Sequence, residues 1–212
     1  MKKGAIFDLD GTLVSTIGLH ERAWKELFLK YNIILTDAEL KEQSGKRNIL
    51  FINSILERKN VAGLNSEKLS NEKDEIVKKY LENNRSAVFN GVEELLDLLK
   101  KQGIKLALAT SATQETAIFL GGDLLNFFDA KIFAEDVQFG KPHPEVFLKA
   151  AQKLGLESSD CIVFEDAQSG IEAAKAGGFF CIAKDNGLGQ NTSKADFVIS
   201  EYNPSELIKF FQ

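Results

Sequence analysis

Asp8 and Asp10 follow directly on the apolar run of residues 5–7 near the start of the chain. Side chains two apart on an extended chain point to the same side, so the two carboxylates would share one face if this run is a strand. Carboxylates this close repel each other unless a cation lies between them, and oxygen ligands suit Mg²⁺. The alternative is that Asp10 and Gly11 form the turn of a hairpin. Residues 12–20 show little strand alternation, which disfavours a hairpin.

A second pair of carboxylates, Glu165-Asp166, closes the apolar run of residues 161–165. At the carboxyl edge of a parallel sheet these groups could join the first pair as metal ligands. Asp is also a preferred helix N-cap, and Asp166 stands just before a helical pattern that starts at Gln168. Capping is therefore the alternative, and it is compatible with a metal-binding role.

Thr110-Ser111 ends the apolar run that starts at Lys105. The two hydroxyls and the backbone amides that follow them could bind phosphate oxygens at a helix N-terminus. A Ser or Thr that only caps a helix is the more common case, so the pattern by itself leaves both roles open.

Lys141 stands between Gly140 and Pro142. Proline fixes its own φ and restricts the residue before it, so this lysine lies on a stiff loop. Taken alone, a lysine is usually a solvated surface charge. Together, the four motifs supply a carboxylate nucleophile, metal ligands, a neutralising cation and oxygen-binding donors, which is the equipment of phosphoryl transfer. The sequence holds no Walker A and no Gly-x-Gly-x-x-Gly pattern, so ATP and dinucleotide sites are not predicted.

Six short apolar runs are predicted to be the strands that position these motifs. Several are apolar throughout, as in strands that are covered on both faces. From about residue 87 onward they alternate with helical patterns, which indicates a parallel sheet. The predicted fold class is therefore α/β, with a Rossmann-like parallel sheet. The predicted strands are residues 5–7, 105–110, 131–133, 161–165, 179–183 and 197–199, and the helices between the later ones are 91–99, 144–154 and 168–176.

The long segment after the first strand holds helical patterns and no convincing strand. Residues 19–31 are amphipathic, and residues 49–58 and 69–83 are predicted to be further helices. We therefore expect two domains. Residues 1–14 and 87–212 would form the α/β core, and residues 15–86 would form an inserted α-helical domain.

The composition excludes several classes of function. The 212 residues carry 26 Lys and Arg against 31 Asp and Glu, a net charge of −5, whereas a dedicated nucleic-acid binder normally carries a basic patch. No run approaches the roughly 18 apolar residues that cross a bilayer. Cys161 and Cys181 lie in apolar runs, which suits reduced and buried thiols. We expect a soluble cytoplasmic protein with no nucleic-acid or membrane partner.

The four motifs, in this order, resemble those of the haloacid dehalogenase-like phosphohydrolase superfamily over essentially the whole chain. Within it, the chain is similar to the β-phosphoglucomutase-like branch, whose members insert a helical cap after the first motif. Residues 169–177 also resemble the stretch that follows the fourth motif in that branch. The motifs are Asp8-Leu9-Asp10-Gly11-Thr12, Thr110-Ser111, Gly140-Lys141-Pro142 and Glu165-Asp166.

The resemblance implies a role for each core residue. Asp8 would attack phosphorus and form an aspartyl-phosphate, and Asp10 would protonate the leaving alcohol and then deprotonate the incoming water or hydroxyl. Mg²⁺ would be held by the Asp8 carboxylate, the Asp10 backbone carbonyl and Asp166, with Glu165 nearby or acting through water. Lys141 would pair with Asp8 and the phosphoryl group. The residues implied to contact phosphate or substrate are Gly11, Thr16, His20, Trp24, Arg47, Lys73, Thr110, Ser111 and Ala112.

The implied roles of the cap residues have alternatives. In that branch, the counterparts of Thr16 and His20 orient the acid/base aspartate, yet His20 could equally serve in hydrogen bonding within the cap. Trp24 is at least as well explained as part of the cap core. In that branch a lysine near the position of Lys73 assists in holding the substrate. Lys73 could also be a solvated charge with partners along its helix.

Two departures separate the chain from the mutases of the branch. Ser15 stands where those mutases usually carry Asp. The loop Ser44-Gly45-Lys46-Arg47, whose arginine would grip a distal phosphate, is one residue shorter. Both departures weigh against mutase activity and leave the phosphoryl-transfer core unchanged.

The function expected from the resemblance is a Mg²⁺-dependent phosphatase that acts on small phosphorylated metabolites, with sugar phosphates as the leading class. The alternative is a β-phosphoglucomutase-type mutase that uses the same phospho-aspartate. A non-catalytic binding protein on this fold is the hypothesis from another class. A dehalogenase is disfavoured because that chemistry does not call for Mg²⁺ or for Asp10 and Asp166. A monomer is the family default.

Overall fold

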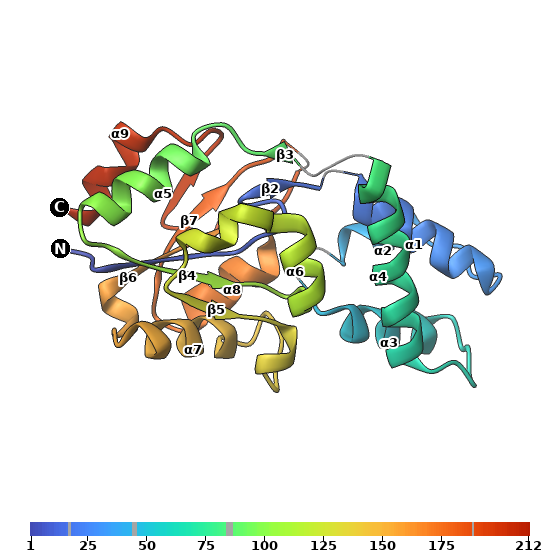
Figure 1. Ribbon diagram of the computed structural model, residues 1–212. Helices are drawn as coiled ribbons and strands as arrows, with labels where there is room; N and C mark the ends of the chain where they lie inside the picture. Colours follow the sequence, from blue (N-terminus) through green and yellow to red (C-terminus); the bar gives the residue numbers. More distant parts are fainter. Residues whose placement is uncertain (17, 44–45, 84–86, 188) are drawn as a thin grey trace.

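A six-stranded parallel sheet lies at the centre of the molecule, in the order β5-β4-β1-β6-β7-β8 (Figure 1). The computed structural model describes residues 1–16, 18–43, 46–83, 87–187 and 189–212. The six strands predicted from the sequence are confirmed, and the fold is α/β as expected. The strands are β1 Gly4–Phe7, β4 Lys105–Ala109, β5 Ala130–Ile132, β6 Cys161–Glu165, β7 Phe180–Lys184 and β8 Phe197–Ile199.

Helices cover both faces of the sheet. Successive side chains of a strand point to opposite sides, so each strand packs against helices on both faces. Ala5 and Phe7 of β1 face α5, α6 and α9, while Ile6 faces α7 and α8. Burial on both faces explains why these strands are apolar throughout instead of alternating. The helices are α5 Val92–Lys101, α6 Gln114–Gly121, α7 Glu145–Leu154, α8 Gln168–Ala176 and α9 Pro204–Leu207, and the 3₁₀ segments are η1 Gly122–Phe127, η2 Ala134–Asp136, η3 Ser158–Asp160 and η4 Ile208–Phe211.

Four helices form an insertion that lies beyond the carboxyl ends of the strands (Figure 1). They pack around a core of their own, in which the rings of Trp24, Phe28 and Phe51 contact one another. Three of the four were predicted. The fourth, α2, has five residues, which are too few to show a helical period, although Thr36 and Glu39 form a capping box at its start. The helices are α1 Leu19–Lys30, α2 Asp37–Lys41, α3 Asn48–Arg58 and α4 Ser66–Asn83.

The insertion leaves and rejoins the core through two short strands, β2 Val14–Ser15 and β3 Ala87–Val88, which pair antiparallel. The sequence did not predict this pair. Asp10 meets Val14 only through an isolated bridge, so Asp10 and Gly11 do not form the turn of a hairpin. The division into residues 1–14 with 87–212 and residues 15–86 stays a prediction.

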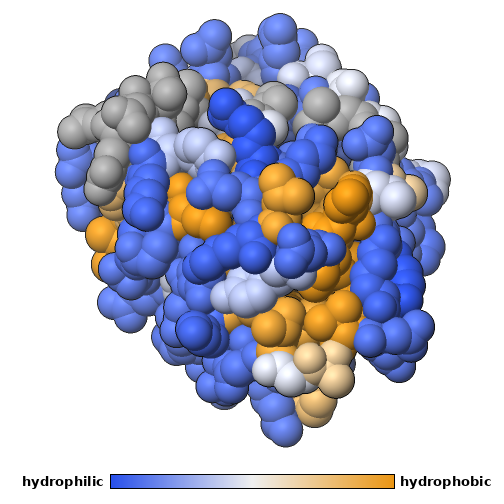
Figure 2. Space-filling view, turned by 90° about the vertical axis from the view of Figure 1, so that its right-hand side faces the viewer, coloured by the Kyte–Doolittle hydropathy of each residue, from blue (hydrophilic) through white to orange (hydrophobic). Residues whose placement is uncertain are grey.

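Figure 2 shows the face that the insertion presents to solvent, where hydrophobic residues gather near the centre and hydrophilic ones surround them. Leu29 and Ile34 are large hydrophobic residues of the insertion that are exposed. In the part of the chain that the structure describes, no helix is both long enough and apolar enough to cross a membrane. Cys161 and Cys181 are buried and not joined in a disulfide, as expected.

Candidate active site

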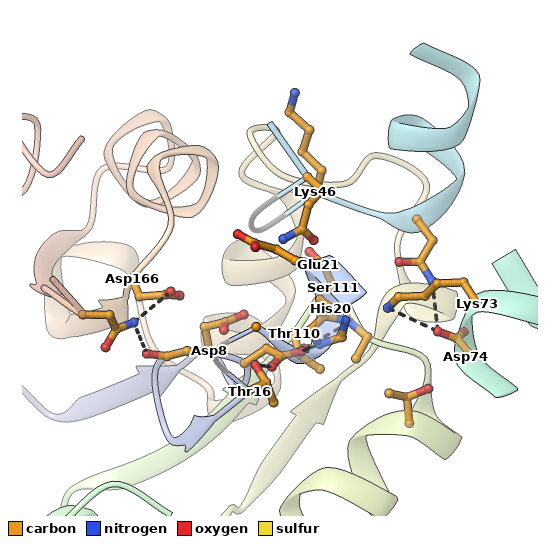
Figure 3. A pocket seen from close by; sticks show the side chains of 18 residues that line it. Asp8, Thr16, His20, Glu21, Lys46, Lys73, Asp74, Thr110, Ser111 and Asp166 are labelled. Carbon is orange, nitrogen blue, oxygen red and sulfur yellow. Dashed lines mark hydrogen bonds and ion pairs between the residues drawn. The ribbon is translucent and has the colours of Figure 1, made fainter. Parts of the chain in front are cut away.

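The register of the sheet brings the four motifs to one edge. Phe7 lies between Leu108 of β4 and Phe164 of β6, so the residues that follow these three strands are neighbours. Asp8, Thr110 and Asp166 accordingly line one cavity of about 140 Å³ between the sheet and the insertion (Figure 3). This is the position at which ligands bind in open α/β sheets.

Lys141 is the cation of this site. Its Nζ donates to Asp8 Oδ1 at 2.5 Å, to Glu165 Oε1 at 2.7 Å and to the Ala109 carbonyl at 3.3 Å. The side chain is 0% exposed, so the alternative of a solvated surface charge is excluded. Burial lowers the pKa of Lys141, but the two carboxylates more than offset this and raise it above its ordinary value. Lys141 therefore stays charged.

One carboxylate oxygen of Asp8 accepts a hydrogen bond from Lys141, and the side chain lies on the wall of the cavity. Burial raises the pKa of Asp8 to about 7, although the positive charge of Lys141 acts in the opposite direction. The carboxylates of Glu165 and Asp10 add to the rise. The site therefore holds more negative charge than Lys141 alone neutralises.

Glu165 lies behind the cavity and does not line it. One of its oxygens accepts from Lys141, and the other accepts from the backbone N–H of Ala167 at 2.7 Å. Gly170 leaves the space for this carboxylate, since a Cβ there would lie 1.7 Å from Glu165 Oε1. The structure thus places Glu165 as a support for Lys141. Its expected place near Mg²⁺, or acting through water, stays a prediction.

Asp166 faces the cavity, and its two oxygens have different partners. Thr12 Oγ1 donates to Oδ1 at 3.3 Å, and Asn186 Nδ2 donates to Oδ2 at 3.2 Å. Burial raises the pKa of Asp166 well above its ordinary value. The N-cap of α8 is Ala167, so the capping alternative for Asp166 does not apply.

Gly11 is required by two features of this corner. Its φ of 81° lies in the left-handed region, and a Cβ would lie 2.2 Å from Asp166 Oδ2. The chain can therefore turn tightly past Asp166 only with glycine at this position.

Asp10 is held by two residues at the start of the insertion. The Thr16 hydroxyl donates to Oδ1, and His20 Nε2 lies 2.5 Å from Oδ2. Burial raises the pKa of Asp10, but His20 and Thr16 outweigh it and hold the pKa below its usual range. The structure thus gives His20 a partner, Asp10, in the cavity, where the sequence had left its role open.

Thr110, Ser111 and Ala112 all line the cavity. The buried Thr110 Oγ1 accepts from the Ala112 N–H at 3.1 Å. The N-cap of α6 is Thr113, whose side chain accepts from the N–H of Thr116, so the capping alternative does not explain Thr110-Ser111.

Of the predicted cap residues, Lys73 lies in the cavity and Trp24 does not. Lys73 is 3% exposed, and its Nζ lies 3.6 Å from Asp74 Oδ1. Burial lowers its pKa, against the effect of Asp74 and Asp10. A solvated charge is therefore excluded. Trp24 is 1% exposed in the insertion core and donates to Gln43 Oε1 at 3.2 Å, so its alternative role in the core is the one that the structure shows.

Arg47 also lies outside this cavity. Its Nη1 donates to the carbonyls of Val137 and Gln138, at 3.4 and 3.2 Å, on the loop that leads to Lys141. Its aliphatic part packs on Gly140, where a Cβ would lie 2.5 Å from Arg47 Cδ. Arg47 is thus not among the residues that line the cavity with Asp8, and its expected grip on a distal phosphate stays a prediction. Ser44 and Gly45 of the same loop lie outside the described residues.

Sequence reasoning missed several residues that line the cavity. Asn186 follows β7 in the same way that the four motifs follow their strands, so the rule of strand ends could have found it. Asn48 and Asp74 are joined by a hydrogen bond of 3.0 Å within the insertion. No local sequence pattern indicates that these two residues line the cavity.

The chain is similar to known hydrolases and sugar-phosphate enzymes. The family described as haloacid dehalogenase-like hydrolase matches residues 2–178. The chain is 34% identical to the fructose-1-phosphate phosphatase YqaB of Escherichia coli K12, over 82% of this chain and 92% of that protein. It is 31% identical to the β-phosphoglucomutase of Bacillus subtilis, over 94% and 89%.

A solved structure gives the same result. The crystal structure of β-phosphoglucomutase from Clostridium difficile superposes with a TM-score of 0.85 at 28% identity, covering 100% of this chain and 97% of that one. The resemblance inferred from the motifs is thereby confirmed. The chain belongs to the haloacid dehalogenase-like hydrolase family, and its relatives include sugar phosphatases and β-phosphoglucomutases.

Proposed function

We propose that the protein is a Mg²⁺-dependent phosphatase of small phosphorylated metabolites, with sugar phosphates as the substrate class. One observation carries the proposal. The Asp8 carboxylate, anchored through one oxygen by Lys141, lines the same cavity as Asp10 and Thr110. A nucleophile, an acid/base group and an oxygen-binding hydroxyl thus surround one space. The similarity to the E. coli phosphatase supports the same substrate class.

The residues at this edge of the sheet fit Mg²⁺. Asp8 and Asp166 are buried carboxylates on the cavity wall, and burial raises the pKa of each. A cation bound between them would favour the charged form of both. Among the described residues, no three His, Cys, Asp or Glu side chains form a metal-binding group. Mg²⁺ commonly uses one or two carboxylates together with water. We therefore assign Asp8, Asp166 and the Asp10 carbonyl as its ligands. When bound, the ion neutralises phosphoryl oxygens and orients them for attack.

In the proposed reaction, a carboxylate oxygen of Asp8 forms a bond to phosphorus while the bond to the leaving alcohol breaks. Asp10 gives its proton to that alcohol and, in the second half, takes a proton from the water that hydrolyses the aspartyl-phosphate. The pKa of Asp10 lies below its usual range in the free site, so Asp10 is ionised there before phosphate binds. The arrival of an anionic phosphate next to Asp10 favours the protonated form that the first step needs.

The second candidate is a mutase, which the similarity to the B. subtilis β-phosphoglucomutase favours. A mutase returns the phosphoryl group to a sugar hydroxyl and must keep water from the phospho-enzyme, whereas a phosphatase must admit water. Rapid conversion of hexose 1-phosphate to 6-phosphate, together with slow hydrolysis of the phospho-enzyme, would decide for the mutase.

The proposal is tested by Asp8→Asn, with Asp123→Asn as the matched control. Asp123 is exposed in η1 and does not line the cavity that holds Asp8. Release of inorganic phosphate from a panel of sugar phosphates is measured with and without Mg²⁺. We expect Asp8→Asn to abolish the release and to unfold at or above the wild-type temperature, while Asp123→Asn keeps full activity. Wild-type turnover in Asp8→Asn would overturn the assignment of the nucleophile.

A further inference from the structure

A second cavity, of about 290 Å³, lies beside the catalytic one between the insertion and the core. Asn48 and Ser111 line both cavities, so the two adjoin. Its walls come from the start of α3, from one face of α4 and from the loops that follow β4 and β5. A substrate whose phosphate lies at Asp8 could extend into this space with its other end.

Ser70 on α4 gives this cavity an available hydroxyl. The residue is 8% exposed and lines the cavity, and it has no side-chain hydrogen bond to any of the described residues. This hydroxyl opens onto the cavity, where it can donate to or accept from a hydroxyl group of a ligand.

The charge of the cavity indicates which ligand fits. Glu135 lies across the N-terminus of α6, where its two oxygens accept from the Gln114 N–H at 3.1 and 3.2 Å. This carboxylate takes the place at which an anionic ligand would otherwise be favoured. Glu67 on α4 adds a second negative charge to the walls.

Arg47 is the cation among the described residues that line this cavity, and its guanidinium is engaged elsewhere. Nη1 donates to the carbonyls of Val137 and Gln138. Two carboxylates therefore face one arginine that is held by the core. Such walls accept hydrogen bonds from hydroxyl groups and disfavour a second phosphate.

We propose that this cavity binds the uncharged, hydroxyl-bearing end of the substrate, so that the enzyme selects sugar monophosphates over sugar bisphosphates. The inference rests on the proposed function and specifies its substrate class. It also bears on the mutase alternative, since transfer of a phosphoryl group to a sugar monophosphate produces a bisphosphate that the site would have to hold.

The test compares Glu67→Lys with Glu57→Lys. Both variants change the charge of the insertion equally, but Glu57 is exposed on α3 and does not line the cavity. The kcat/KM of the full chain with Mg²⁺ is measured for a hexose monophosphate and for the corresponding bisphosphate. We expect the wild type to prefer the monophosphate. Glu67→Lys should raise the ratio of bisphosphate to monophosphate by about fivefold or more, and Glu57→Lys should leave it unchanged.

A second variant, Ser70→Leu, fills the cavity without changing charge. It should lower kcat/KM for the hexose monophosphate relative to a short alkyl phosphate that does not reach the cavity, by about tenfold. Equal ratios in Glu67→Lys and Glu57→Lys, or a wild type that prefers the bisphosphate, would overturn the inference. Hydrolysis of the short ester without hydrolysis of either hexose phosphate would overturn it too and leave the proposed function standing. If no ester is hydrolysed with Mg²⁺, the proposed function fails and the inference with it.

Discussion

Asn186 links Asp166 to the turn after β1. Its Nδ2 donates to Asp166 Oδ2 at 3.2 Å and to the Gly11 carbonyl at 2.8 Å, while its Oδ1 accepts from Lys184 at 2.9 Å. One amide thus fixes the orientation of a carboxylate that we assign to Mg²⁺ and the position of the backbone that follows Asp10.

We predict that Asn186→Ala weakens Mg²⁺ binding, because outer partners of a ligand commonly account for about tenfold or more in metal affinity. The Mg²⁺ concentration for half-maximal activity should rise about tenfold, with less change in activity at saturating Mg²⁺. Asn126→Ala, an exposed change in η1, is the control. An unchanged Mg²⁺ requirement in Asn186→Ala would remove the positioning role.

Lys141→Met should abolish activity and destabilise the fold. The change leaves Asp8 and Glu165 buried without their cation, and breaking a buried pair in this way costs about 3 kcal/mol or more. Burial raises the pKa of Asp8 to about 7. Because protonation discharges Asp8, the loss of stability relative to the wild type should shrink as the pH falls. Urea unfolding at pH 7 and pH 5 measures this. An equal loss at both pH values would show that packing, and not charge, is responsible.

Gly170→Ala tests whether Glu165 positions Lys141. The added Cβ would lie 1.7 Å from Glu165 Oε1, so the carboxylate must move away from Lys141. We expect a fall in kcat of about tenfold or more, with KM little changed. Gly122→Ala is the control, since its φ of 49° strains a side chain but a Cβ there meets nothing within 4 Å. A wild-type kcat in Gly170→Ala would show that the position of Glu165 does not affect catalysis.

Glu145 gives a prediction on pH. Its hydrogen bond with Lys149, and then those from the N–H groups of Gln138 and Phe139, lower the pKa of Glu145 to about 2. The folded state therefore binds the proton less readily than the unfolded chain. The stabilisation is complete above the ordinary value of 4.5 and is lost as the pH falls toward 2.

Glu145→Gln should accordingly lower Tm by about 2–4 °C at pH 7, and the difference should narrow below pH 4.5. Thermal unfolding of both proteins across this range measures it. Glu157→Gln, an exposed change beyond α7, is the control. A difference in Tm that stays constant down to pH 2 would contradict the prediction.

The core could be predicted because strands buried on both faces are apolar, and Asp8, Thr110 and Asp166 stand where such runs end. Asn186 meets the same condition, but it follows its strand without a familiar motif. β2 and β3 have two residues each, which is too short to show an alternation of apolar and polar residues in the sequence. The direction of Arg47 depends on carbonyls about ninety residues away along the chain, and such a long-range contact leaves no local signal.

The antiparallel pairing of Val14 with Val88 has a consequence for how such a chain diversifies. Since the two ends of the four-helix segment lie side by side, a short turn could replace the whole segment without stretching the sheet. Helices of another length or shape could likewise be exchanged there. Selection for new substrates can therefore act on one interchangeable module, while the residues that perform the chemical step stay as they are.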